Sequence, residues 1–215
     1  MNNNKIIYIY DPLCGWCYGF SPVIQKIQNE YAEKLDFDII SGGMVIGDRE
    51  GLIGDFADYI LKALPRLEEM TGVKFGEPYL SKLRDKSLYQ SSLKPCIALE
   101  VFKSFNEKDA ITFASSIQKA QYVDGHDLQN DSVYLELIKP YGILPEAFLQ
   151  KLNSDEFRME TTNQFKMIQE WGISGFPAVI LVKDNQFYLI AKGYVDYENL
   201  NKVIEKILAE KTTLS

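Results

Sequence analysis

The chain has 215 residues, of which 46% are hydrophobic and 25% are charged, and its formal net charge is -7 at pH 7. This length is enough to bury a core without disulfides or a structural metal. The negative charge, without a dense Lys/Arg cluster, disfavours nucleic acid as a partner. The sequence has no apolar stretch near the roughly 20 residues that a membrane span requires, so we expect no membrane partner.

The first forty residues predict a strand, a helix and a second strand. Lys5 to Tyr10 is apolar and aromatic, and Asp11-Pro12 ends this strand because proline lacks an N–H and restricts the residue before it. From Tyr18 onward, apolar residues recur at helical spacing. Leu35 to Ser41 then alternates as a strand does. The pattern is typical of a β-α-β unit.

The middle of the chain, residues 48 to 171, shows almost no strand pattern and is expected to be a helical insert. Helices are predicted at Pro95 to Phe105, Asp109 to Val123, Asp131 to Lys139, Pro145 to Asn153 and Asp155 to Trp171. The absence of a repeat or a low-complexity linker favours an insert in one α/β domain over a separate domain at a chain end.

The last part of the chain returns to a strand pattern after Gly172. Ala178 to Val182 and Gln186 to Ala191 predict a hairpin, and Asp196 is expected to cap a final helix. We therefore predict an α/β fold in which residues 1–47 and 172–215 form one domain and residues 48–171 form a helical insert domain.

Two cysteines, Cys14 and Cys17, follow the first predicted strand three residues apart. A disulfide needs Cα atoms within about 7 Å, which one helical turn provides. The unpaired N–H groups at the start of a helix stabilise a thiolate at Cys14, so we expect it to be the attacking thiol. Cys17 lies one turn deeper and is expected to resolve a mixed disulfide. The pair predicts thiol–disulfide exchange.

The residues alone leave two alternatives to a redox role for the cysteine pair. Free cysteines are often small buried hydrophobes. A structural zinc site usually takes four Cys or His ligands, but beyond the pair the sequence offers only Cys96 and His126. We therefore expect no metal, and interpret Cys96 as a core thiol and His126 as a surface residue.

The segment DPLCGWCYGF, the helical insert and the segment GISGFPAVILV together resemble the DsbA-like branch of the thioredoxin superfamily. They resemble more closely its FrnE-like group of predicted disulfide isomerases. The resemblance spans nearly the whole chain in element order and implies a thioredoxin-like fold without a cofactor. It also implies that Pro177 is cis and lies against the cysteines, where the backbone of Phe176 can pair with an extended substrate.

The pair between the cysteines, Gly15-Trp16, departs from the residues that strongly oxidising members and thioredoxins carry there. Phe176 departs from the smaller or β-branched residue of many members. These differences mean that the redox potential of either group need not apply to the Cys14–Cys17 pair. We also expect the aromatic rings of Trp16 and Phe176 to contact the substrate beside Pro177.

These observations predict a thiol–disulfide oxidoreductase, a reductase or an isomerase, that acts on protein or peptide thiols and disulfides, or on glutathione or another small thiol. Lys5 to Tyr10 is too short for a secretory signal, so a cytoplasmic location is expected. A glutathione-dependent transferase or isomerase of the kappa type is an alternative, because such proteins have a similar helical insert. They lack the cysteine pair, so Cys14 disfavours this alternative. A non-enzymatic module that binds partners between the insert and the sheet is a third.

Overall fold

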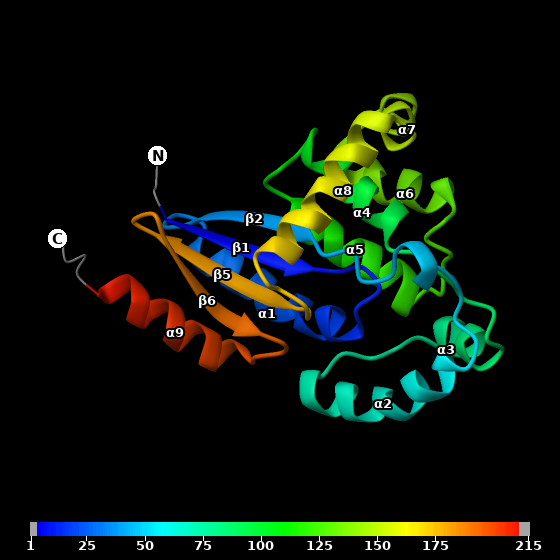
Figure 1. Cartoon of the computed structure of the whole chain (residues 1–215), viewed down its shortest axis with the longest axis horizontal. Helices are drawn as coiled ribbons and strands as arrows, with labels where there is room; N and C mark the ends of the chain where they lie inside the picture. Colours follow the sequence, from blue (N-terminus) through cyan, green and yellow to red (C-terminus); the bar gives the residue numbers. More distant parts are fainter. Residues whose placement is uncertain (1–3, 211–215) are drawn as a thin grey trace.

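A computed structural model describes residues 4–210 and contains a four-stranded sheet of order β2-β1-β5-β6 (Figure 1). Strands β1 (Lys5–Tyr10) and β2 (Asp36–Ser41) are parallel and are joined by helix α1 (Gly15–Tyr31), which confirms the predicted β-α-β unit. Strand β5 (Ala178–Lys183) is antiparallel to β1 and forms the predicted hairpin with β6 (Gln186–Lys192). Residues 1–3 and 211–215 of the predicted thioredoxin-like domain lie outside the described residues.

Successive side chains of a strand point to opposite faces of the sheet, and different helices cover the two faces. On one face, Tyr8 of β1 and Val179 of β5 belong to the core that includes α1 and α9 (Tyr197–Ala209). On the other face, Ile7 and Ile9 pack with Ile168 of α8 (Asp155–Glu170). Because β1 is buried on both faces, its sequence is a continuous apolar run.

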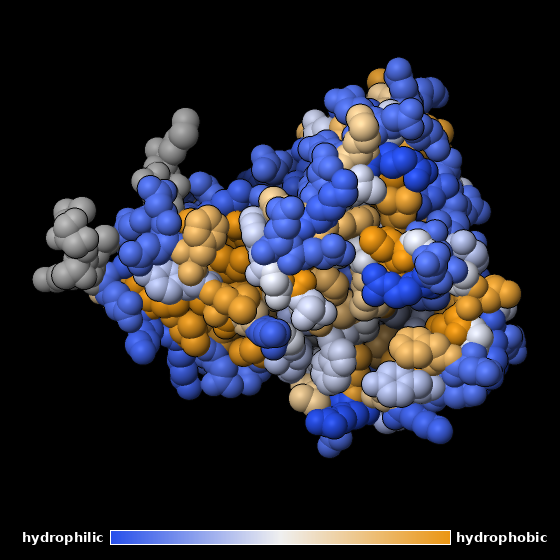
Figure 2. Space-filling view, viewed as in Figure 1, coloured by the Kyte–Doolittle hydropathy of each residue, from blue (hydrophilic) through white to orange (hydrophobic). Residues whose placement is uncertain are grey.

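The second face is less covered near the edge strand β6. Phe187 and Leu189 are exposed there, and with Trp171, Ile173 and Ile180 they line a shallow groove. Figure 2 shows apolar residues gathered on the surface over β5 and β6.

Most helices of the middle segment lie beyond one end of the sheet, and α8 reaches back over one of its faces (Figure 1). The helices of this segment are α2 (Phe56–Thr71), α3 (Glu77–Arg84), α4 (Leu93–Lys103), α5 (Ala110–Tyr122), α6 (Asp131–Ile138), α7 (Pro145–Leu152) and α8, with short 3-10 turns at Gly47–Arg49 and Lys139–Tyr141 and a two-residue ladder between β3 (Gly51–Leu52) and β4 (Tyr89–Gln90). The five helices predicted from Pro95 onward are confirmed, with ends that differ by at most two residues. The division into a domain and an insert domain stays a prediction.

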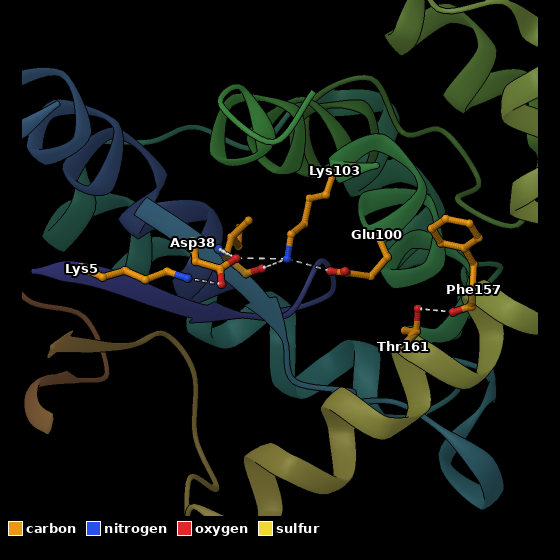
Figure 3. A network of polar contacts seen from close by, with 7 residues as sticks. Lys5, Asp38, Glu100, Lys103, Phe157 and Thr161 are labelled. Atoms are coloured by element: carbon orange, nitrogen blue, oxygen red, sulfur yellow. Dashed lines mark hydrogen bonds and ion pairs between the residues drawn. The ribbon is translucent and has the colours of Figure 1, made fainter. Parts of the chain in front are cut away.

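A buried ionic network joins α4 to β2 (Figure 3). The Lys103 Nζ atom lies 3.0 Å from the Asp38 carboxylate and 3.3 Å from the Glu100 carboxylate, and donates a hydrogen bond to the Ile39 carbonyl at 2.9 Å. Lys5 pairs with the other carboxylate oxygen of Asp38 at 2.9 Å. The side chains of Glu100 and Lys103 are only 4% and 14% exposed, so each charge depends on its partners rather than on water.

Candidate active site

The two cysteines lie where the chain leaves β1 and enters α1. Cys14 is the N-cap of α1, and its Sγ atom accepts the backbone N–H of Cys17 at 3.3 Å. The backbone N–H of Cys14 donates to the carbonyl of Asp11 at 3.1 Å, which closes the loop after the strand. Both thiols are free, and their exposed fractions are 5% for Cys14 and 0% for Cys17. The predicted order, with Cys17 the less accessible thiol, is confirmed.

The segment before β5 brings the far end of the chain to these thiols. The Phe176–Pro177 peptide bond is cis, as the resemblance implied. The Cys14 Sγ–H group donates to the Phe176 carbonyl at 3.5 Å, a long contact for a weak sulfur donor. The structure therefore places Cys14, Phe176 and Pro177 together.

The aromatic rings of Phe176 and Trp16 occupy different parts of the site. An added Cβ atom at Gly42 would lie 2.0 Å from Phe176 Cζ, so this ring packs directly over the glycine at the end of β2. Trp16 is half-buried, packs against both the main core and the core of α2 and α3, and has its ring centroid 6.2 Å from that of Tyr194. The Phe176 ring therefore packs at the end of β2 and the Trp16 ring packs between two cores, and the contact of either ring with a substrate stays a prediction.

The surroundings of Cys17 disfavour its thiolate. Burial raises the pKa of this thiol well above its ordinary value, and the hydrogen bond and charge of Cys14 raise it further. The Tyr8 hydroxyl lies 3.5 Å from the Cys17 carbonyl, and its own pKa is also raised by burial. The environment of Cys17 therefore favours its protonated thiol over its thiolate.

One residue of the site, Asp11, was not found from the sequence. Its carboxylate is fully buried and accepts hydrogen bonds from the Leu13 N–H at 2.9 Å, the Met44 N–H at 2.7 Å and the Ser92 hydroxyl at 2.9 Å. Burial raises the pKa of Asp11 to about 6, although these hydrogen bonds oppose the rise. The sequence signal is a carboxylate three residues before Cys14, inside the DPLCGWCYGF segment, but neither the strand end at Asp11-Pro12 nor the resemblance assigns Asp11 a role.

Other candidates lie away from this chemistry. Cys96 is a fully buried residue of α4, as expected for a core thiol, and His126 is exposed. Residues 4–210 contain no group of three or more His, Cys, Asp or Glu side chains placed to hold a metal ion. Over the same residues, each helix is too short or too polar to cross a membrane.

Comparison with known proteins gives the class of the chain. A family described as Thioredoxin matches residues 7–202, so the chain belongs to the thioredoxin family. A solved structure of a candidate protein disulfide isomerase from Nitrosomonas europaea is 28% identical with a TM-score of 0.85, covering 96% of this chain and 98% of that one. The chain is thus a thiol–disulfide oxidoreductase with a DsbA-like, thioredoxin-type fold, as predicted.

Two further relatives are similar over nearly the whole chain. The cytosolic disulfide reductase DsbM from Pseudomonas aeruginosa is 26% identical with a TM-score of 0.78, over 95% of this chain and 98% of that one. A second DsbM structure contains GSH. The ClpXP adapter protein SpxH of Halalkalibacterium halodurans is 20% identical, over 96% of this chain and 68% of SpxH.

Proposed function

We propose that this oxidoreductase exchanges disulfides through Cys14 and Cys17. The Cys14 thiolate attacks a substrate disulfide, forms a mixed disulfide and releases one substrate thiolate. After losing its proton, Cys17 attacks the Cys14 sulfur, which forms the Cys14–Cys17 disulfide and releases the second substrate thiol. The substrate gains the two electrons that the cysteine pair loses. A second route, in which another substrate thiol attacks the mixed disulfide, isomerises the substrate and leaves the pair reduced.

The main support for this proposal is that three structural features coincide at the Cys14 Sγ atom. Cys14 is the N-cap of α1, its Sγ atom accepts a hydrogen bond from the Cys17 N–H, and the same sulfur contacts the Phe176 carbonyl beside Pro177. A substrate strand that pairs with the Phe176 backbone would bring its own sulfur to Cys14. We propose Trp16, Phe176 and Pro177 as the substrate contacts.

We further propose that the enzyme is a reductase or isomerase of protein or peptide disulfides in the cytoplasm, with glutathione or a similar small thiol as the reductant that restores the pair. The reducing poise of that compartment keeps a thioredoxin-like couple mostly in the dithiol form. The cytosolic reductase activity of DsbM, and its structure with GSH, support this choice.

The mechanism is tested with Cys17→Ser, which removes the resolving thiol. Incubated with oxidised glutathione, this variant should hold one glutathione on Cys14, seen by intact mass and peptide mapping. Cys14→Ser keeps Cys17 and Cys96 and is the matched control, which should hold none. Trapping at Cys17 or Cys96 in place of Cys14, or no trapping at all, would refute the mechanism.

The direction of exchange is tested by equilibrating the wild-type pair in graded glutathione buffers. A potential of about -270 mV would indicate a reductase, and one of about -180 mV or higher an isomerase or an oxidant. The kappa-type alternative is tested with the Cys14→Ser/Cys17→Ser double variant. We expect it to conjugate no glutathione to an electrophile such as chlorodinitrobenzene, and conjugation that survives would favour the transferase.

A further inference from the structure

One face of α5 lies against the cysteine loop and the first turn of α1. The side-chain amide of Gln118 donates to the Asp11 carbonyl at 3.3 Å, just before the cysteines. Tyr122, at the end of α5, is four residues further on and so lies on the same face of the helix. Its ring centroid is 5.1 Å from that of Tyr18, the residue that follows Cys17. Tyr122 therefore packs beside the reactive pair.

The hydroxyl group of Tyr122 is buried without a hydrogen-bond partner. The residue is only 3% exposed. Two other tyrosines of the chain satisfy their hydroxyls, because Tyr18 donates to the Lys74 carbonyl at 2.9 Å and Tyr134 to the Leu128 carbonyl at 2.5 Å. Within residues 4–210, the Tyr122 hydroxyl makes no hydrogen bond. A buried donor without a partner is unfavourable, and a catalytic role is one reason for a protein to retain it.

The electrostatic surroundings of Tyr122 connect its hydroxyl with the first thiol. Burial raises the pKa of Tyr122 well above its ordinary value, and the charges of Tyr79 and then Cys14 raise it further. The charge of Cys14 acts on Tyr122 more strongly than that of Cys17. The phenol therefore keeps its proton at every pH at which thiols react, and it is available as a donor near the Cys14 sulfur.

We propose that Tyr122 is a catalytic residue of the exchange reaction, whose hydroxyl donates a hydrogen bond to the Cys14 thiolate. This inference rests on the proposed exchange at Cys14 and Cys17. In the structure the Cys14 thiol donates to the Phe176 carbonyl, but a thiolate has no proton to donate and is repelled by that oxygen. The ionised sulfur then needs donors, which are the Cys17 N–H that it already accepts and the unpaired Tyr122 hydroxyl.

The same hydrogen bond stabilises Cys14 as a leaving group. When a substrate thiolate attacks the substrate sulfur of the mixed disulfide, the bond from that sulfur to Cys14 breaks and its electron pair stays on Cys14. The Tyr122 hydroxyl keeps its own proton throughout this step. A donor that is already in place where negative charge develops lowers the barrier.

The substitution that removes only the donor is Tyr122→Phe. Because the hydroxyl has no partner within residues 4–210, its loss should not destabilise the fold, which circular dichroism checks. Tyr79→Phe is the matched control. Tyr79 is also 3% exposed, belongs to the same core, and has its ring centroid 5.1 Å from that of Tyr122. Burial is the only cause that raises its pKa, so its hydroxyl does not interact with the cysteines.

The experiment measures the rate at which iodoacetamide alkylates Cys14 between about pH 5 and about pH 9, with Cys14 followed by peptide mapping. At about pH 7, Tyr122→Phe should react about tenfold more slowly than wild type, and its curve of rate against pH should move to higher pH. Tyr79→Phe should stay within about twofold of wild type. The other titratable groups that face the two sulfurs, Tyr8, Tyr10 and Asp11, are the same in both variants. An unmoved curve in Tyr122→Phe, or equal shifts in both variants, would overturn the inference.

A measurement that keeps the Tyr122 hydroxyl covers the case in which Tyr122→Phe does not fold. The NMR shift of the Tyr122 Cζ carbon in the reduced wild-type protein should change over the same pH range as the rate of Cys14 alkylation. In Cys14→Ser this change should disappear. A Tyr122 shift that ignores the ionisation of Cys14 refutes the inference, whereas a Cys14 that traps no glutathione in Cys17→Ser refutes the proposed function instead.

Discussion

At the scale of single residues, Asp11 has the most unusual environment, because its carboxyl group is held where water is excluded. Burial raises its folded-state pKa to about 6, above the unfolded value of about 3.9. The folded state therefore binds this proton more tightly. The resulting stabilisation is fully present below the unfolded pKa, and it is lost as the pH rises through the folded pKa.

This sign gives a measurable pH dependence. The stability of wild type relative to Asp11→Asn should fall by about 2 kcal/mol between about pH 4 and about pH 7, because only wild type loses the proton. Urea denaturation across this range measures the difference. Asp36→Asn removes an exposed carboxylate and controls for the change in net charge. A difference that is constant with pH would show that Asp11 titrates alike in the folded and unfolded states.

Gly42 determines where the Phe176 ring can lie. A Cβ atom at this position would lie 2.0 Å from Phe176 Cζ, so Gly42→Ala must displace the ring and disturb the carbonyl that Cys14 contacts. We expect insulin reduction to slow by about tenfold to a hundredfold while the fold remains intact, because a misplacement of about 1 Å near the reacting atoms can cost about a hundredfold in rate.

The control lies beside the same phenylalanine. An added Cβ atom at Gly175 would meet no atom within 4 Å, so Gly175→Ala should keep wild-type turnover. In a Phe176→Ala background, where the clash is absent, Gly42→Ala should have little further effect. Equal slowing by Gly42→Ala with and without the Phe176 ring would show that the ring is not the cause.

The residues of the site were predictable to different extents. The placement of Cys14 at the start of a helix and of Cys17 one turn deeper follows from their spacing in the sequence, and the structure has Cys17 as the more buried thiol. Asp11 and Gly42 depend on contacts with Ser92, Met44 and Phe176, which lie far away in the sequence. Local periodicity carries no information on such contacts.

At the scale of the elements, Lys103 links α4 to the sheet more firmly than packing alone would. Lys103→Met leaves the Glu100 and Asp38 carboxylates without their shared cation in a site that is largely closed to water. We expect the free energy of unfolding to fall by about 3 kcal/mol, measured by urea denaturation.

The matched control is Lys139→Met, because Lys139 and Glu136 have the same i, i+3 spacing on an exposed surface. Its loss of stability should be much smaller, since solvent screens that pair. Adding Glu100→Gln to Lys103→Met should recover part of the loss, because it removes one unpaired charge. Equal losses in the two lysine variants would mean that burial does not strengthen the network.

Helices and strands could be predicted from the sequence where a regular spacing of apolar residues continues along the whole element. The strands of the sheet and the helices from α4 onward have regular apolar spacing or clear caps, such as Asp196, whose side chain accepts the Asn199 N–H. Helices α2 and α3 were not individually predicted. In α2, Ala57, Leu64 and Leu67 are buried and Ile60 and Leu61 pack beside them at helical spacing, but Pro65 lies inside this stretch, where a proline usually ends or kinks a helix.

At the scale of the whole molecule, the helices of the middle segment contribute to different cores. Helices α4 to α7 contribute residues to the same core as the sheet, including Phe102 and Phe113, whose ring centroids are 4.0 Å apart. Helices α2 and α3 instead enclose a second core around Phe75 and Tyr79, which meets α1 at Trp16. Helices α4 to α7 are therefore stabilised by packing in the core of the sheet, whereas α2 and α3 are stabilised by packing in the second core.

This division predicts unequal local stability, measurable by native-state hydrogen exchange. In α4, 8 of 11 residues are buried, whereas in α2 only 3 of 16 are. Opening α2 and α3 exposes the smaller core alone, but opening α4 breaks the core that also holds the sheet. Amides of α2 and α3 should therefore exchange through a local opening, well before those of α4, α5 and β1.

The same measurement tests the predicted boundaries. If residues 48–171 form an insert domain, the amides of α2 through α8 should open together and share one free energy of opening. If the cores determine which elements open together, α4 and α5 should have the same free energy of opening as β1. The free energy of opening of α2 should then be lower. We expect the second result, because the buried side chains of α4 belong to the core of the sheet and Lys103 is bound to β2. A common value for α2 and α4, distinct from that of β1, would contradict it.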